Sequence, residues 1–294
     1  ELLDDYPVSG VDIKLDWNGV TDKLPEGVRV IFYPKSAEGR KIDTYLSVRG
    51  GKVKVPPGRY SVVAYNYDTE TVQIRGEEAY ETIEAFTGYC NGLGIAGTEK
   101  MVWGPDPLYV VQINDLHIAN SEEELLLDWK PKLVVKTYSF KIKVEGLEYV
   151  SSIVGSVEGM AGCYCLGRCC GMMNDAPIYF EAQGCSGEVT GSFTAFGLPE
   201  GAMSRASLAI KFTLAFVKVD NTVQKIEVDI TDVIVNSESG EGGGNDEPSK
   251  DIELPLDDDE VKVDKPENSS GGDGGIGGDV GDWGEEEEVP LPVI

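Results

Sequence analysis

Apolar and polar residues alternate along most of the first 235 residues, and this period of two restricts the chain to β structure. In residues 11–17, four apolar side chains alternate with Asp12, Lys14 and Asp16. Successive side chains of a strand point to opposite faces of a sheet, so such a segment buries one face and exposes the other. No long stretch has the spacing of an amphipathic helix. The sequence therefore predicts an all-β protein.

Turn residues such as Asn18-Gly19 and Pro56-Pro57-Gly58 separate the β-branched and aromatic runs. Residues 77–86 fit either a short helix or a strand. Turn signals every 8–12 residues or so are typical of β-sandwiches. The expected strands are residues 11–17, 28–33, 44–48, 52–55, 59–67, 71–75, 108–113, 125–127, 133–144, 178–182, 188–196, 208–219 and 225–235.

Three regions are expected: an N-terminal β-sandwich in residues 1–130, a C-terminal β-sandwich in residues 131–236, and a tail in residues 237–294. The tail holds 19 acidic residues against 3 lysines and is rich in glycine. Such a composition buries too little apolar area to offset its ordering entropy, so residues 237–268 are expected to be mobile. Two apolar islands, residues 252–256 and 289–294, are exceptions. We predict that one of them packs as a strand, on its own sandwich or on a neighbour.

The net charge of −27 excludes several classes of partner. Nucleic acid binding needs Lys and Arg against the phosphates, and anionic lipid needs a polybasic patch. The sequence has no stretch of about 18 apolar residues, which is the length that a helix needs to span a membrane. The chain begins at Glu1 without Met, which fits a processed chain or one whose leader has been removed.

Six cysteines are the most conspicuous chemical feature: Cys90, Cys163, Cys165, Cys169, Cys170 and Cys185. Short thiolate spacings can hold zinc, but the spacings here are C-x-C and C-x₃-C, without a second C-x₂-C pair. Free thiols in a loop, one or two disulfides, and a metal site all remain open, in that order of preference. We expect that folding needs no zinc.

Other motifs favour no enzyme. Residues 92–97 match G-x-G-x-x-G, but no βαβ pattern surrounds them and Gly104-Pro105 follows closely, so a plain glycine-rich loop is expected. His117 is the single histidine, and no G-x-S-x-G elbow occurs. The acidic runs of the tail lack the order of a calcium loop. We expect no catalytic residue, no cofactor and no metal.

Four tryptophans could offer a platform for sugar stacking: Trp17, Trp103, Trp129 and Trp283. The first three lie beside strand patterns, where packing in the core is the commoner use of the indole ring. Trp283 lies in the tail.

Several stretches resemble the fimbrillin-like proteins of type V pili from Gram-negative gut and oral anaerobes, and more narrowly the surface lipoproteins related to pilus anchor and minor subunits. The combination of Pro-Pro-Gly-x-Tyr with Tyr-Asn-x-Asp-Thr-Glu is the most specific part. The stretches that carry the resemblance are residues 1–6, 11–17, 28–34, 55–60, 65–70, 138–146, 156–162 and 193–198.

The resemblance covers about residues 1–236 and implies two transthyretin-like β-sandwich domains. It implies export, and a lipidated cysteine upstream of Glu1 that ties the precursor to the outer membrane at the cell surface. It implies partners among other pilus subunits, joined by β-strand addition, and leaves a glycan or a host protein open. It offers no catalytic residue, and the cysteine-rich segment is not typical of it.

We therefore expect a non-enzymatic surface protein that builds or anchors pili involved in adhesion. The alternative is a glycan-binding surface lipoprotein that works with an outer-membrane importer. A flexible tail with alternating apolar residues could donate a strand to an open sheet edge. The candidate residues for strand exchange are Val289, Leu291, Val293 and Ile294.

Overall fold

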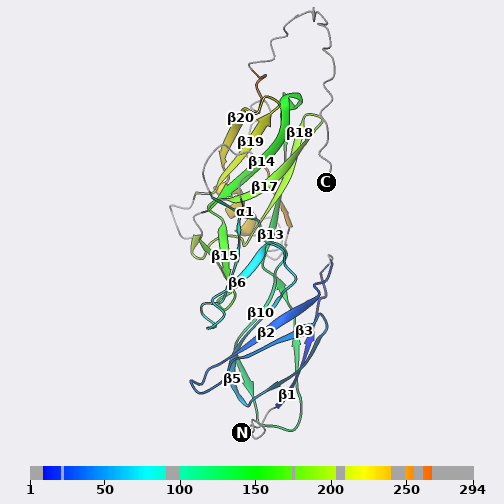
Figure 1. Cartoon of the computed structure of the whole chain (residues 1–294), viewed down its shortest axis with the longest axis vertical. Helices are drawn as coiled ribbons and strands as arrows, with labels where there is room; N and C mark the ends of the chain where they lie inside the picture. Colours follow the sequence, from blue (N-terminus) through cyan, green and yellow to red (C-terminus); the bar gives the residue numbers. More distant parts are fainter. Residues whose placement is uncertain are drawn as a thin grey trace, which may run out of the picture.

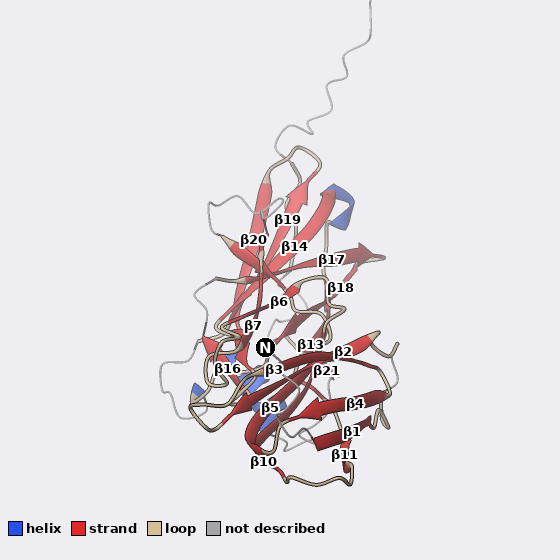
Figure 2. Cartoon of the chain, turned by 60° about the horizontal axis from the view of Figure 1, so that its bottom comes forward, coloured by secondary structure: helices blue, strands red, loops and turns tan. Residues whose placement is uncertain are grey.

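The fold is almost entirely β. The structure, a computed structural model, describes residues 9–20, 23–90, 100–173, 176–202, 209–239, 249–254 and 261–266. Within these residues the strands are accompanied by one α-helix, α1 (Thr231–Ser239), and one 3₁₀ turn (Leu147–Tyr149). Strands dominate the view in Figure 2. The prediction of an all-β protein is confirmed.

The N-terminal sheet has eight strands and encloses its own core. Its order is β11 (Leu125–Trp129), β1 (Ser9–Leu15), β4 (Gly50–Val55), β3 (Ile42–Ser47), β2 (Gly27–Pro34), β5 (Gly58–Asn66), β10 (Tyr109–Ile118) and β12 (Lys132–Leu133). Val11 and Ile13 of β1 are fully buried in this core, as the alternation predicts. Trp129 closes it from β11.

A four-stranded middle sheet lies between the two ends of the molecule (Figure 1). Its order is β16 (Cys170–Met173), β15 (Ala161–Cys165), β7 (Glu84–Thr87) and β6 (Val72–Arg75). It covers the outer face of the N-terminal sheet. Val30 and Phe32 of β2 face the N-terminal core, whereas the intervening Ile31 and Tyr33 face a middle core that also holds Tyr164.

The C-terminal sheet has nine strands and forms the upper lobe in Figure 1. Its main order is β20 (Val223–Asp229), β19 (Lys211–Lys218), β14 (Val150–Glu158), β17 (Ile178–Cys185), β18 (Glu188–Ala195), β13 (Lys136–Lys143) and β21 (Ser249–Asp251). Two short strands join it beside β17: β9 (Met101–Trp103) pairs with β17, and β8 (Tyr89–Cys90) pairs with β9.

Three of these pairings cross the expected boundary near Lys130. Strand β10 pairs with β12, just after the boundary. Strand β7 pairs with β15 in the middle sheet, which takes two strands from each side of residue 130, and β9 runs parallel to β17 in a sheet made largely of later strands. The division at residue 130 stays a prediction about the chain. The sheets themselves interleave across it.

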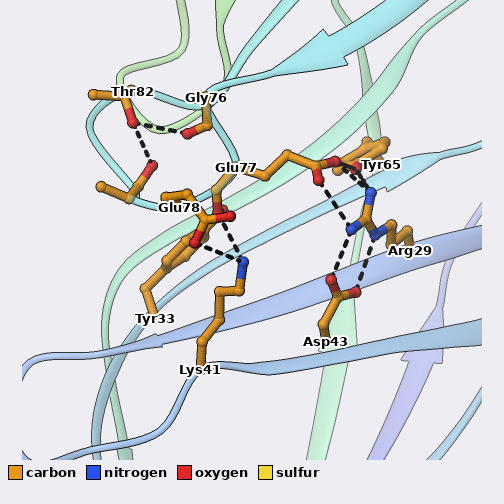
Figure 3. A network of polar contacts seen from close by, with 10 residues as sticks. Arg29, Tyr33, Lys41, Asp43, Tyr65, Gly76, Glu77, Glu78 and Thr82 are labelled. Carbon is orange, nitrogen blue, oxygen red and sulfur yellow. Dashed lines mark hydrogen bonds and ion pairs between the residues drawn. The ribbon is translucent and has the colours of Figure 1, made fainter.

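A network around Arg29 fastens the turn between β6 and β7 to the N-terminal sheet (Figure 3). The Arg29 guanidinium donates to both carboxylate oxygens of Asp43, at 3.0 and 2.7 Å, and pairs with Glu77 on the turn. Tyr33 Oη and Lys41 Nζ donate to the Glu77 carbonyl at 3.0 and 3.1 Å. These bonds hold the middle sheet against the N-terminal lobe.

The strand predicted over residues 225–235 is correct only in its first half. Strand β20 ends at Asp229 and helix α1 begins at Thr231. The Asp229 carboxylate accepts hydrogen bonds from the Thr231 amide, at 2.8 Å, and from the Thr231 hydroxyl, a side-chain turn that ends the strand just before the helix. Ile230 and Ile234 are fully buried, so packing decides for the helix over the β-branched composition.

Candidate functional site: the edge of strand β13

Strand β13 lies at one side of the C-terminal sheet. One of its edges pairs with β18 over its whole length, from Lys136 opposite Ala195 to Lys143 opposite Glu188. The other edge would end the sheet if nothing covered it. Main-chain N–H and C=O groups on an uncovered edge are a template for a further strand.

The chain covers this edge with a segment from its own tail. Strand β21 runs parallel to β13, with Ser249 opposite Thr137 and Asp251 opposite Ser139. The Ile252 amide then donates to the Ser139 carbonyl at 2.8 Å. Ile252 and Leu254 are 6% and 5% exposed and belong to the C-terminal core. Main-chain bonds and alternate apolar side chains together make this an added strand.

A second stretch of the tail continues beyond the end of β13. The Glu145 amide donates to the Val261 carbonyl, and the Val263 amide donates to the Glu145 carbonyl, both at 2.9 Å. Val261 and Val263 are 3% and 1% exposed. Gly146 has a φ of +81°, and a Cβ there would meet the Val263 carbonyl oxygen at 2.3 Å. Only glycine therefore lets the tail approach so closely.

Gln224 of β20 connects this stretch to the opposite end of the sheet. Its side-chain amide donates to the Lys262 carbonyl at 2.7 Å and accepts from the Asp264 amide at 2.9 Å. The Gln224 side chain thus takes the place of a neighbouring strand's backbone in both hydrogen bonds. The tail residues 261–264 lie between Glu145, just after β13, and β20, and they close the C-terminal lobe.

The start of β13 is held by a buried polar cluster. Tyr138, fully buried, donates its hydroxyl to Glu238 of α1 at 2.8 Å, and Lys136 forms an ion pair with the same carboxylate. The Glu238 side chain is 10% exposed. Burial raises the pKa of Tyr138, and the Glu238 carboxylate raises it further. Helix α1 thereby fixes the end of the strand on which the tail pairs.

These contacts settle part of the prediction for the tail. The first island packs on its own sandwich through the buried Ile252 and Leu254, but the strand that pairs with β13 is the preceding Ser249–Asp251 and not the island itself. The expectation of mobility outside the two islands is wrong for residues 249–251, which pair with β13, and for residues 261–266, where Val261 and Val263 are buried. The second island, with Val289, Leu291, Val293 and Ile294, lies outside the described residues.

The six cysteines all lie within the described residues as free thiols. Cys165 and Cys170 are directly opposite in the β15–β16 hairpin, and Cys170 Sγ lies 3.5 Å from Glu200. Burial raises the pKa of Cys170 to about 11, and Arg168 opposes this rise. Among the described residues, no group of three or more His, Cys, Asp and Glu side chains is arranged to hold a metal.

The remaining sequence candidates do not converge on one place. His117 is exposed on β10, opposite Arg59. Trp129 is 5% exposed and Trp17 is half-buried, but Trp103 is 42% exposed, so its expected place in the core is wrong. The glycine-rich residues 92–97 and Trp283 lie outside the described residues. In the part of the chain that is described, no helix is both long and apolar enough to cross a membrane.

Sequence reasoning missed Gln224 and Glu238, which hold the tail and the start of β13. Neither belongs to a motif, since each acts through a partner far along the chain. The available signal was weaker: residues 261–263 form a third short apolar island in the tail. Its alternation fits the burial of Val261 and Val263 around the exposed Lys262.

Comparison with known proteins gives a family match, a close relative and related solved structures. The family described as "Domain of unknown function (DUF5119)" matches residues 1–181. A Bacteroides ovatus protein named "Putative fimbrium anchoring subunit Fim4B" is 56% identical over 310 residues, covering all of this chain and 92% of the relative. A crystal structure of "a putative adhesin" from Bacteroides ovatus, also 56% identical, covers 91% of this chain and 96% of that chain with a TM-score of 0.78.

A more distant structure shares the fold. The fimbrial anchor protein Mfa2 from Porphyromonas gingivalis is 10% identical and superposes with a TM-score of 0.51. The match covers 83% of this chain and 88% of that chain. At this identity the likeness concerns the arrangement of the strands alone.

Proposed function

The chain belongs to the DUF5119 family, and we propose that it is a non-enzymatic structural subunit that anchors or builds a surface fimbrium. A relative that is 56% identical over the whole chain bears the name of a fimbrium anchoring subunit, which supports this role. The structure of the 56% identical Bacteroides ovatus protein, titled a putative adhesin, agrees with it. A subunit of this kind is exported and acts at the cell surface.

The single observation that carries a mechanism is the tail strand on β13. Parallel main-chain pairing with alternate buried side chains is how one protein adds a strand to the sheet of another. Here the same contacts are made within the chain, so the C-terminal lobe caps its own β13 edge. A subunit with this edge capped does not need a neighbour's strand there.

The donor in this mechanism is the last part of the tail. Val289, Leu291 and Val293 occupy alternate positions, so they would point to one face of an extended strand. Pro290 and Pro292 lie between them. Proline is tolerated in an edge strand, because the side of the strand that faces solvent needs no backbone N–H to pair with a neighbour. The terminal segment adds to an open sheet edge of the next fimbrial subunit.

The attachment to the outer membrane is a separate part of the proposal. A lipidated cysteine in the precursor, upstream of Glu1, would hold the subunit at the membrane and leave the tail to engage the fibre. Metabolic labelling of the producing cells with an alkyne fatty acid, followed by immunoprecipitation, tests this directly. An unlabelled protein would remove the lipid anchor and leave strand donation untouched.

Strand donation is tested with two matched triple variants in the producing bacterium. Val289→Asp, Leu291→Asp and Val293→Asp together place charge on the apolar face. Glu285→Gln, Glu286→Gln and Glu287→Gln together change charge just upstream of it. We expect the first variant to lose surface fibres or release them to the medium, as seen by electron microscopy, and the second to keep them. Fibres that stay attached in the first variant would contradict donation by this segment.

A clean deletion of the gene tests the broader role. We expect loss of cell-attached fibres, restored by the wild-type gene in trans. Attached fibres of normal number in the deletion strain would overturn the anchoring or structural role itself. This outcome differs from failure of the triple variant alone, which would concern only the donor segment.

A further inference from the structure

An open groove lies in the middle of the C-terminal sheet, away from the β13 edge. Its volume is about 560 Å³, and it runs over β14 and β17. A smaller hollow of about 220 Å³ adjoins it over β17 and β18. Tyr179 and Glu181 line both. The larger volume lies within the range of about 300–1,000 Å³ typical of small-molecule sites.

The strand alternation of β17 explains this surface. Ile178, Phe180 and Ala182 belong to the C-terminal core, so Tyr179, Glu181 and Gln183 face outward between them. Glu181 and Gln183 are exposed. The Tyr179 hydroxyl donates to Glu181 at 3.2 Å, which orients the carboxylate beside the ring.

An aromatic wall stands at one end of the groove. Trp103 of β9 lies opposite Tyr179 of β17, and their ring centroids are 5.5 Å apart at an angle of 89°. The Trp103 amide donates to the Gly88 carbonyl at 3.1 Å, so the backbone beneath the indole is fixed. Tyr179 is nearly buried, whereas 42% of Trp103 is exposed. The indole therefore offers apolar surface to a ligand in the smaller hollow.

The polar lining is uncharged except at one residue. Ser192 and Thr194 of β18 line the smaller hollow, and Gln183 and Ser152 line the larger groove. Among the described lining residues Glu181 alone carries a charge. Such a surface offers hydroxyl, amide and carboxylate partners but no cation. An anionic ligand would meet Glu181 and a protein of net charge −27 with nothing to neutralise it.

We propose that this groove binds a neutral oligosaccharide, with one sugar ring packed on Trp103. The C–H face of a pyranose is apolar and fits an aromatic surface, while its hydroxyl groups pair with short polar side chains and a carboxylate. Glu181 accepts hydrogen bonds from two neighbouring hydroxyl groups. The same residue excludes sialylated or uronic acid chains. This binding is independent of how the subunit joins its fibre.

Affinity electrophoresis of the full chain tests the proposal. The probes are neutral polysaccharides (galactomannan, xyloglucan, arabinoxylan and starch) and, as the anionic comparison, polygalacturonate. We expect at least one neutral polymer to slow migration and polygalacturonate to have no effect. Failure of every neutral polymer to slow the protein overturns the proposal.

Variants then place the binding in the groove. With oligosaccharides of the retarding polymer, titration calorimetry should show a rise in Kd of about tenfold or more for Trp103→Ala, as expected for an anchoring aromatic residue. Trp103→Phe keeps an aromatic ring and should stay within about threefold of the wild type. Ser192→Arg fills the smaller hollow at an exposed position and should weaken binding even if Trp103→Ala folds poorly.

The matched control is Tyr45→Ala, which removes another exposed aromatic ring, on the N-terminal lobe. It should leave Kd unchanged. An equal loss in Tyr45→Ala and Trp103→Ala, or no loss in both Trp103→Ala and Ser192→Arg, would remove the groove as the binding site.

Discussion

Two glycines in the middle of strands make room for the aromatic core of the C-terminal lobe. A Cβ on Gly155 would lie 2.2 Å from Cζ of Phe180, and one on Gly191 would lie 2.6 Å from Cζ of Phe140. The rings fill these places and contact each other, with Phe180 and Phe212 stacked at 5.4 Å. Glycine normally weakens a strand, but here the close approach of a ring explains it.

The Glu238 carboxylate should matter more to stability than an exposed carboxylate of the same type. Glu238→Ala leaves the fully buried Tyr138 hydroxyl without its acceptor and Lys136 without its partner. We expect a loss of about 2–3 kcal/mol in the free energy of unfolding, measured by urea denaturation. Glu238→Gln keeps an acceptor for Tyr138 and should cost less than half as much.

The matched control for this prediction is Glu124→Ala. Glu124 also pairs with a lysine, Lys52, at 2.7 Å, but both side chains are exposed. Water screens such a pair, so the urea midpoint should stay unchanged. Equal destabilisation by the two alanine variants would mean that the buried cluster does not hold β13.

At the scale of elements, the sequence predicted strands best where one face is buried and turn residues mark both ends. Strand β2, expected at residues 28–33, spans Gly27–Pro34, and β5, expected at residues 59–67, spans Gly58–Asn66. The central strand β14 was missed because Ser151, Ser152 and Gly155 interrupt its apolar pattern. Its strand character comes from pairing with β17 and β19 on both sides, which local sequence does not show.

The sequence could predict that the tail contains a strand, but not the sheet edge with which that strand pairs. Alternating apolar residues in an acidic, glycine-rich segment indicate a strand that needs a sheet. The tail pairs with the edge of β13 because, among the described strands, only β18 occupies its other edge, and because Gln224 binds Lys262. Tertiary structure sets both of these conditions. The sequence could therefore predict that a strand of the tail adds to a sheet, but not that it pairs with β13 and Gln224.

Two truncations separate the capping stretch from the rest of the tail. Ending the chain after Ser239 keeps Glu238 but removes Ile252, Leu254, Val261 and Val263 from the core. Burial of each is worth about 1.5–3 kcal/mol before the ordering entropy is subtracted, so we expect a net loss of about 2–4 kcal/mol in the free energy of unfolding. Urea denaturation followed by tryptophan fluorescence measures it.

Ending the chain after Pro266 is the control for this truncation. It keeps every described tail contact, so the urea midpoint should match that of the full chain. The shorter truncation should also self-associate in sedimentation velocity, because it uncovers the β13 edge. If it stays monomeric and as stable as the full chain, the tail does not cap this edge.

In the whole molecule, three large cores follow one another along the long axis, a smaller buried cluster around Met101 and Tyr179 lies on the C-terminal sheet, and the chain passes between the large cores more than once. The middle core takes Ile31 and Val63 from the N-terminal sheet and Tyr164 and Phe196 from beyond residue 160. The strand periodicity and the spacing of turns predicted two sandwiches, one after the other along the chain. They could not show the middle sheet, because β15 finds its partner β7 about 80 residues away and neither strand forms a hairpin with the other.

The middle core is rich in tyrosine, and this makes the stability of the whole molecule sensitive to alkaline pH. Burial raises the pKa of Tyr33, Tyr65 and Tyr164, whereas each titrates near 10 when the chain is unfolded. The folded state therefore keeps protons that the unfolded state loses. The stabilisation from burying neutral rings is fully present below about pH 10 and falls as the pH rises above it, by about 1.4 kcal/mol per tyrosine and pH unit.

Urea midpoints measured between about pH 8 and pH 11.5 should show this fall in stability. Tyr164→Phe removes one titrating ring from the middle core, so the slope of the fall should decrease by the contribution of one tyrosine. An unchanged slope in Tyr164→Phe would mean that the Tyr164 ring does not contribute to the alkaline transition.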